Sequence, residues 1–416
     1  MSVKLTETEK RKLLIVERKL VRNHGHHHTQ IAALKKLFPG FDYHLMTGEG
    51  YDGFLGASAA QISGRSRDLS KLKWRMSHGT GRQKADAFLR AMLSGRLLSL
   101  PNSPYGDELQ DVCARLAFGR SDLILVPSAD LETLESLSDL IDVRAADTPR
   151  LIARFLDIDL GEHKEARRQE RLKKVFDTVS SHDGLSLFSE TEEMAAEMKK
   201  RYGLDVCGEF YLPCSFDPAD QVRGPERPGD APFRVGLFGG ARPGKGYERI
   251  SGIVACLEKL VEARRPSSPV EILLQGTERD YGPGGVYEFA GAYVEVGGPL
   301  RVVRLSDRLS PEDFRDRFLS VDAILLPYDT KFYGLQGSGI IQDAVAAQKS
   351  IIHSRGIAMQ AFLSHGNAIS AVSDEEFAQA IVSMPDEERN HRAALRDAAL
   401  YYKSILEANY TRFLMT

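Results

Sequence analysis

The sequence predicts an α/β protein with two doubly wound, mostly parallel sheets. Short apolar runs typical of buried strands alternate with amphipathic runs typical of helices. This alternation stops once, over residues 213–232, where proline and glycine are frequent, and it then starts again. A chain of 416 residues is long enough for two such domains.

The first half of the chain contains short apolar runs that predict strands over residues 13–16, 42–46, 122–126, 151–156 and 186–188. We expect helices over residues 29–37 and 131–140. Residues 48–81 are rich in Gly, Ser and Arg, which predicts a long loop with one short helix. Ser189 and Glu192 have the spacing of a capping box, so we expect Ser189 to cap a helix that ends near Tyr202.

The second half repeats this pattern, with expected strands over residues 233–238, 270–274, 300–305, 323–327 and 350–353. Ser310, with Pro311 next and Asp313 three residues on, marks a helix start, and Ser373 with Glu376 marks another. We expect the C-terminal part of the chain to be helical.

The composition is that of an ordinary soluble globular protein, with 42% hydrophobic residues, 27% charged residues and a net charge of −3. This charge gives no support for nucleic-acid binding. No apolar run is long enough to span a bilayer, and the polar start of the chain does not have the pattern of a secretory signal. The four cysteines show no C-x-x-C spacing, so we expect reduced thiols in a cytoplasmic protein.

The most informative segment is the glycine-rich turn 239–247, which lies between a predicted strand and a predicted helix. Gly239 and Gly240 let backbone N–H groups approach an anion, and a helix N-terminus favours negative charge. Arg242 and Lys245 add two cations. The pattern predicts a diphosphate site.

Two other interpretations of this turn remain open. Residues 239–245 fit the P-loop pattern G-x-x-x-x-G-K, but Gly246 stands where a nucleotide triphosphatase has the Ser or Thr that holds Mg²⁺. The second alternative is a glycine-rich turn that carries two exposed cations and has no ligand.

A second cluster follows the predicted strand that ends at Pro327. Ser338 and Gly339 are expected at a helix N-terminus, where their N–H groups and the Ser338 hydroxyl can hold a phosphate. Asp343 lies one turn further, and a carboxylate at that place suits the two hydroxyls of a ribose. The alternative is an ordinary capped helix with a solvated Asp343.

Together the two clusters resemble the GT-B glycosyltransferases, especially the large retaining, family 4-like group that uses nucleotide-sugar donors. In the second half the segments 239–246, 305–327 and 338–352 carry the resemblance. In the first half, residues 15–37 resemble the first strand, Gly/His loop and helix of this group, and residues 189–213 resemble its helix and strand before the linker.

The resemblance implies a GT-B fold, with two Rossmann-like domains and a cleft between them. It implies an acceptor-binding domain over residues 12–215, a linker over 216–232 and a nucleotide-sugar-binding domain over 233–388. Residues 389–416 would form a helix that packs back toward the first domain.

The chain departs from this group at one motif. Many members carry two glutamates eight residues apart, where this chain has Leu335 and Asp343. The ribose contact is therefore left to an aspartate, and we expect Gln336 or backbone N–H groups to contact the transferred sugar. The departure leaves open both the identity of the donor and the retaining outcome.

A histidine cluster, residues 24–28, follows the first predicted strand. It could bind a metal, form a surface loop without a role, or line the cleft where the resemblance implies sugar contacts. In the last case Gly25 would let the backbone approach the donor, and His26 and His27 would lie on the acceptor side.

Asp157 and Asp159 follow a predicted strand at its carboxyl end, where an acid could act as a base toward an acceptor hydroxyl. Solvated loop carboxylates are the alternative. The run 164–174 is rich in Lys and Arg and is either a solvated helix face or a contact with an anionic lipid surface or a lipid-diphosphate acceptor.

These observations predict a glycosyltransferase that moves a sugar from a nucleoside diphosphate sugar to an acceptor hydroxyl. The acceptor, a cell-envelope glycan or lipid-linked sugar, is implied by the resemblance alone. Peripheral contact with the inner membrane face would be made through residues 164–174. Arg242 and Lys245 would neutralise the departing diphosphate. No D-x-D pair follows a strand in the second half, so we expect no metal and no cofactor besides the donor. The alternatives are a sugar-nucleotide epimerase or hydrolase and a non-catalytic sugar-nucleotide-binding protein.

Overall fold

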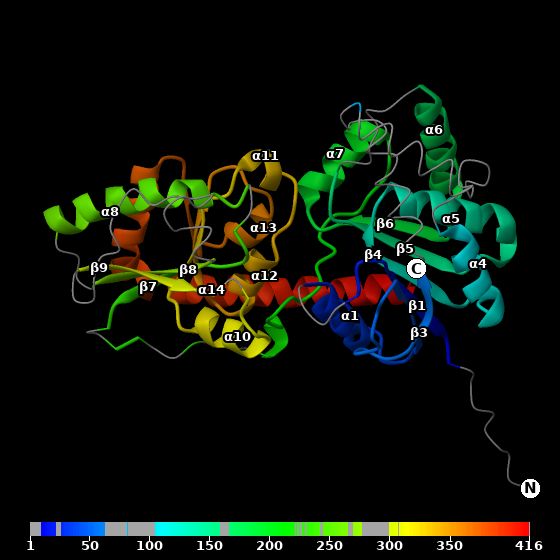
Figure 1. Cartoon of the computed structure of the whole chain (residues 1–416), viewed down its shortest axis with the longest axis horizontal. Coiled ribbons are helices and arrows are strands. Elements are labelled where there is room, and N and C mark those ends of the chain that lie inside the picture. The colour runs from blue at the N-terminus through cyan, green and yellow to red at the C-terminus, as the bar shows by residue number, and fades with distance from the viewer. Residues whose placement is uncertain are drawn as a thin grey trace, which may run out of the picture. The chain divides into compact units, whose positions relative to one another are not determined.

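The computed structural model describes residues 10–21, 26–62, 81, 105–158, 166–220, 222, 224, 227–228, 231–241, 244–264, 269–276, 299–306 and 308–415. The chain divides into two compact units (Figure 1). The first comprises Met1–Glu190 and Ala195–Gly208, and the second comprises Thr191–Met194 and Glu209–Thr416. Each unit contains one six-stranded sheet in which every pair of neighbouring strands is parallel. The prediction of two Rossmann-like α/β domains is confirmed.

The first sheet has the strand order β3-β2-β1-β4-β5-β6. Its strands are β1 (Lys12–Glu17), β2 (Asp42–Gly48), β3 (Ser58–Ile62), β4 (Leu123–Ala129), β5 (Arg150–Phe155) and β6 (Leu185–Ser189). Its helices are α1 (His26–Leu37), α4 (Gly106–Arg115), α5 (Leu131–Arg144), α6 (Ala166–Ser181) and α7 (Glu192–Tyr202). The central strand β1 is buried from Leu13 to Glu17, as expected for a parallel strand covered on both faces.

The second sheet has the order β12-β11-β10-β7-β8-β9, which is the same topology counted from its own first strand. Its strands are β7 (Phe233–Leu237), β8 (Val270–Gln275), β9 (Leu300–Leu305), β10 (Ala323–Leu326), β11 (Ser350–Ser354) and β12 (Ala368–Ala371). The helical elements of this unit are η2 (Pro218–Asp220), η3 (Tyr247–Arg249), α8 (Ile250–Arg264), α10 (Pro311–Leu319), α11 (Thr330–Tyr333), α12 (Gly339–Ala346), α13 (Gln360–Leu363) and α14 (Asp374–Met415).

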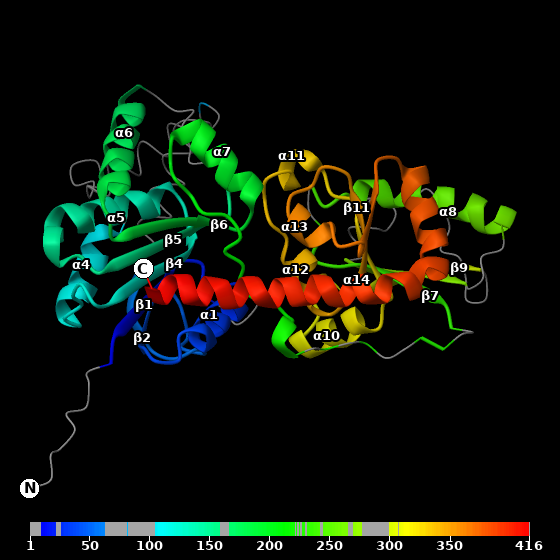
Figure 2. The ribbon, with the colours of Figure 1, turned by 180° about the vertical axis from the view of Figure 1, so that it is seen from behind.

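Alternate residues of the second sheet enter two separate hydrophobic cores. Ala323 and Leu325 of β10 pack with α8 and with the first part of α14, whereas Ile324 and Leu326 pack with α10, α12 and the later part of α14. Helix α14, drawn in orange to red in Figure 2, therefore contributes to both cores, and Pro385 lies between its two contributing parts. The alternation is the period of two that a strand imposes on its side chains.

Two short strands, one helix and one helix start differ from the sequence-based expectation; the helix is α4, which no predicted element covers. β3 lies in a segment that we expect to be a loop, and its sequence, SAAQI, has only one β-branched residue. β12, with the sequence AISA, has four residues and gives too short a pattern to detect. The prediction that Ser189 caps α7 is wrong, because Ser189 ends β6 and the Thr191 hydroxyl accepts the N–H of Met194 at 3.1 Å. The predicted caps Ser310 and Ser373 are confirmed.

Candidate functional site

The glycine-rich turn lies where the second sheet reverses its strand order. β7 and β10 are neighbours at the centre, and the strands that follow each of them lie on opposite sides of the sheet. Such a switch point leaves a crevice outside the carboxyl ends of the two strands, which is where open α/β sheets bind ligands. The turn follows β7 and the segment 327–338 follows β10, so both predicted donor-binding segments start at this edge.

The backbone of the turn requires glycine at several positions. Gly239, Gly244 and Gly246 have φ values of +87°, +86° and +71°, in the left-handed region that other residues rarely adopt. A Cβ on Gly246 would also overlap the carbonyl oxygen of Pro327. A Cβ on Gly240, in contrast, would meet no atom within 4 Å, and this glycine is exposed. The glycines therefore let the turn approach the end of β10 and leave one open position.

Lys245 is buried in the turn, with 6% of its surface exposed. Its Nζ lies 3.5 Å from the carbonyl oxygen of Phe238 and 6.0 Å from the centre of the Tyr328 ring. The N–H of Asp329 donates to the carbonyl of Gly244 at 2.8 Å, which joins the turn to the loop after β10. The Lys245 side chain thus lies at the switch point of the second sheet. Its partner cation Arg242 lies outside the described residues.

The start of α12 lies against the same turn. Ser338 is the N-cap residue, and its hydroxyl lies 3.4 Å from that of Tyr328. Its N–H points at the sulfur of Met359, at 3.1 Å. A Cβ on Gly239 would lie 3.9 Å from Cδ1 of Ile340, so the turn and the first turn of α12 are in contact range. Gln336 is half-buried in the loop before α12.

Asp343 of α12 has partners that the sequence does not predict. Its Oδ1 accepts the N–H groups of Ser215 and Phe216 at 2.7 and 3.0 Å. The residue is 2% exposed. Burial raises the pKa of this carboxyl to about 7, although the hydrogen bonds from Phe216 and Ser215 act in the opposite direction. In this structure Asp343 holds the backbone of the segment before η2, and the ribose contact stays a prediction.

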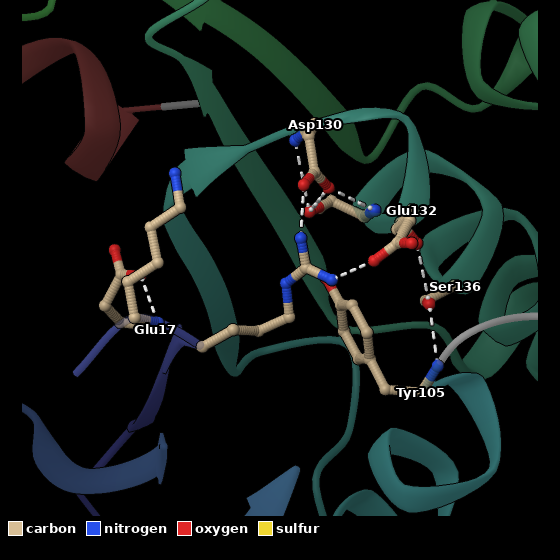
Figure 3. A network of polar contacts seen from close by, with 8 residues as sticks. Glu17, Tyr105, Asp130, Glu132 and Ser136 are labelled. Carbon is tan, nitrogen blue, oxygen red and sulfur yellow. Dashed lines mark hydrogen bonds and ion pairs between the residues drawn. The ribbon is translucent and has the colours of Figure 1, made fainter. Parts of the chain in front are cut away.

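The first sheet has its own switch point between β1 and β4, which gathers several charged side chains. Arg18, directly after β1, pairs with Asp130 and Glu132 at the start of α5 and lies over the Tyr105 ring (Figure 3). Asp130 also caps α5 by accepting the N–H of Thr133 at 3.0 Å. This network ties β1 to α5.

Glu17, the last residue of β1, is a buried carboxylate at this edge that sequence reasoning missed. Its Oε2 lies 3.5 Å from Nδ1 of His27, and its Oε1 accepts the N–H of Lys19 at 2.9 Å. Burial raises its pKa, but the contacts with His27, Ser128 and Lys19 outweigh burial and leave the pKa below the ordinary value. Its position in the sequence could have identified it, because a charged residue at the end of an apolar run lies at the carboxyl edge of the sheet.

The other predicted site residues of the first half lie outside the described residues or away from the switch point. His26 begins α1, but its side chain lies outside the described residues, as do Gly25 and Asp159. Asp157 is exposed after β5, which is not a strand of the switch point.

In the basic run 164–174, only Lys173 and Lys174 have described side chains; both are exposed, and Lys174 lies 3.7 Å from Asp142. Within the described part of the chain, no helix is both long and apolar enough to cross a membrane.

Comparison with known proteins identifies the fold. No protein-family model and no curated protein sequence matches the chain. Among solved structures, it is similar to a UDP-forming trehalose-phosphate synthase from Burkholderia xenovorans, with a TM-score of 0.59 and 12% identity over 97% of this chain and 98% of that one. For Anabaena HepE in complex with UDP, the TM-score is 0.56, with 15% identity over 97% of this chain and 100% of that one. For a glycosyltransferase from Rickettsia africae, the TM-score is 0.59, with 13% identity over 98% and 99%. These likenesses, with two sheets of the same topology, show that the chain has the GT-B fold that its sequence predicts.

Proposed function

We propose that the protein is a glycosyltransferase that transfers a sugar from a nucleoside diphosphate sugar to an acceptor hydroxyl. The observation that carries this proposal is the buried ammonium of Lys245 in a glycine-rich turn at the switch point of the second sheet. Solved proteins of similar fold support it, since the Burkholderia enzyme is UDP-forming and HepE was solved with UDP and glucose.

The reaction breaks the bond between the sugar C1 and the β-phosphate oxygen and forms a bond from C1 to the acceptor oxygen. The acceptor hydroxyl gives up its proton, for which Asp157 is the candidate base. Negative charge grows on the departing diphosphate, so fixed donors around it lower the barrier. Lys245 supplies one charge, and Arg242 supplies a second. Gly240 and Gly339, with the N-terminal end of α12, supply backbone N–H groups. Two cations in place of a metal favour metal-independent transfer.

In this proposal the first unit binds the acceptor. Asp157 and His27 are the candidate acceptor-side groups with described side chains, and the basic run 164–174 is the candidate contact for a lipid-linked acceptor. The acceptor would be a cell-envelope glycan or lipid-linked sugar, used at the cytoplasmic face of the inner membrane. We propose a retaining outcome on the strength of the family resemblance.

One observation favours a second candidate, a non-catalytic sugar-nucleotide-binding protein. Asp343, which replaces a glutamate of the resembled group, is bound to Ser215 and Phe216. One experiment separates the candidates. Thermal-shift screening with UDP, GDP, ADP and CMP first identifies the nucleotide, because a ligand that binds the native state raises the melting temperature. Release of that nucleotide from its sugar conjugates is then measured with and without glycan acceptors.

Each outcome has one meaning. Release that depends on an acceptor supports the transferase, and release without an acceptor indicates a hydrolase. Binding without release and without conversion of the sugar indicates the non-catalytic protein, and conversion of the sugar without release indicates an epimerase. If none of the nucleotides binds, the proposed function is wrong.

A further inference from the structure

Gly239, the first residue of the turn, is held on both of its peptide groups by buried side chains. Its N–H donates to Oε1 of Gln275, the last residue of β8, at 2.6 Å. Its carbonyl accepts the hydroxyl of Tyr247, the first residue of η3. That hydroxyl also lies 3.1 Å from the backbone carbonyl oxygen of Gln275. One side chain from β8 and one from the end of the turn therefore fix the orientation of Gly239.

This orientation decides where the ammonium of Lys245 lies. The peptide that joins Phe238 to Gly239 is planar, so Gln275 fixes its N–H and thereby also the carbonyl that points toward Nζ at 3.5 Å. The left-handed φ of Gly239 leaves empty the place of a side chain, and Nζ occupies it, because a Cβ built there would overlap this atom. The backbone conformation of Gly239 thus creates the space that the Lys245 ammonium occupies.

Gln275 and Tyr247 are 6% and 1% exposed. The hydrogen bonds described above join both side chains to the backbone of the turn and of β8, which places them to influence a bound anion through Lys245. An ammonium whose position is fixed before the ligand arrives loses less conformational freedom on binding. We propose that Gln275 and Tyr247 are positioning residues that hold Lys245 ready for the diphosphate; this inference rests on the proposed function of the turn.

A double-mutant cycle tests the proposal. Tyr247→Phe removes only the hydroxyl, and Gln275→Met removes the acceptor while keeping a side chain of similar length. Each change is made in the natural chain and in the Lys245→Met background, and the dissociation constants of UDP, GDP and inorganic pyrophosphate are measured by calorimetry. We expect each change to weaken binding by about five- to tenfold when Lys245 is present. In the Lys245→Met background we expect less than about a twofold effect, because residues that act through one group do not add.

Tyr43→Phe is a matched control in the first unit, since the Tyr43 hydroxyl is likewise shared between two backbone carbonyls, those of Lys35 and Phe38. It should lower the melting temperature without changing the dissociation constants. If Tyr247→Phe fails to fold, Gln275→Met decides. Equal losses in the two Lys245 backgrounds, or no loss in either, would overturn the positioning role while leaving the proposed function standing. If the natural chain binds none of these probes and neither ADP nor CMP, the proposed function itself fails.

Discussion

The carboxylate of Asp343 receives the backbone N–H of Ser215 at 2.7 Å, across 128 positions of the sequence. The same oxygen receives the N–H of Phe216 at 3.0 Å. A carboxylate that accepts two backbone donors stabilises the loop that carries them. These two hydrogen bonds therefore fix residues 215–216 against α12. They use the same carboxylate that the sequence analysis predicts to bind the ribose.

The first prediction concerns nucleotide discrimination. If Asp343 keeps its backbone partners when nucleotide binds, loss of the ribose 2′-hydroxyl leaves no buried acceptor unpaired. We then expect the preferred nucleoside diphosphate and its 2′-deoxy analogue to bind with dissociation constants within about threefold of each other, as measured by calorimetry. A much weaker deoxy analogue, with a smaller gap in Asp343→Asn, would instead assign Asp343 to the ribose.

The second prediction concerns the pH dependence of stability. The pKa of Asp343 is raised from 3.8 to about 7, so between these values the folded protein retains a proton that the unfolded chain releases. The contribution of this group to the free energy of unfolding is fully present below pH 3.8 and is lost as pH rises through about 7. Asp343→Asn, which keeps an acceptor oxygen, should remove this loss, which amounts to at most about 4 kcal/mol.

Urea unfolding of both proteins at pH 4.5 and at pH 7.5 measures this difference. All other groups titrate alike in the two proteins and cancel in the comparison. Parallel stability curves across this range would show that the carboxyl of Asp343 titrates normally.

The third prediction concerns the cations of the turn. Lys245→Ala and Arg242→Ala should each weaken binding of the preferred nucleoside diphosphate by about ten- to a hundredfold, the worth of a charge-assisted hydrogen bond. Calorimetric titration measures the effect, and circular dichroism checks that the fold is kept. Lys259→Ala is a suitable control, because Lys259 is an exposed cation on α8, outside both donor-binding segments. Unchanged affinity in both turn variants would remove the basis of the proposed function.

The fourth prediction concerns metal. If Lys245 and Arg242 neutralise the leaving diphosphate, release of nucleotide from the sugar donor should survive an excess of EDTA over the divalent ions present. The assay follows nucleotide release before and after chelation. Loss of activity with EDTA and its return with Mg²⁺ or Mn²⁺ would transfer this role from the two side chains to a metal.

The fifth prediction uses two glycines of the same turn. Gly246→Ala places a side chain on the Pro327 carbonyl at a φ of +71°, so we expect a loss of about 3 kcal/mol or more in the free energy of unfolding. Gly240→Ala meets open space and should change stability by less than about 0.5 kcal/mol. Chemical unfolding compares the two variants. Similar stabilities would mean that the turn does not pack on β10 as described.

The sequence predicts much of the fold because long apolar runs mark the central strands. β1, β4, β7 and β10 each contain a predicted run, and their burial on both faces is what makes such runs continuous. β3 and β12 escape prediction because β3 has a single β-branched residue and β12 has only four residues, whereas the other edge strands, β6 and β9, have runs that the sequence shows. The predicted cap of α7, Ser189, lies two residues before the observed one, Thr191. Both residues have a hydroxyl and precede the acidic start of the helix, so the sequence alone does not show which one caps it.

The site is predictable in part. Gly239 and Lys245 follow from the spacing of glycines and a cation after a strand, which is a local pattern. The partners of Asp343 and the contact of Glu17 with His27 depend on segments far apart in the sequence, so no local pattern shows them. The same holds for Gln275, which reaches Gly239 only because β8 lies beside β7.

The long helix α14 contributes side chains to both faces of the second sheet. Ala398, Tyr402, Ile405 and Leu406, late in this helix, belong to the core that contains Ile341 and Ala344 of α12. The Tyr402 hydroxyl donates to Oε1 of Gln342 at 2.8 Å, so the helix also carries a buried polar contact with α12. A premature stop codon shortly after Pro385 would therefore uncover the apolar side of α12, and the shortened product would be a target for aggregation and proteolysis.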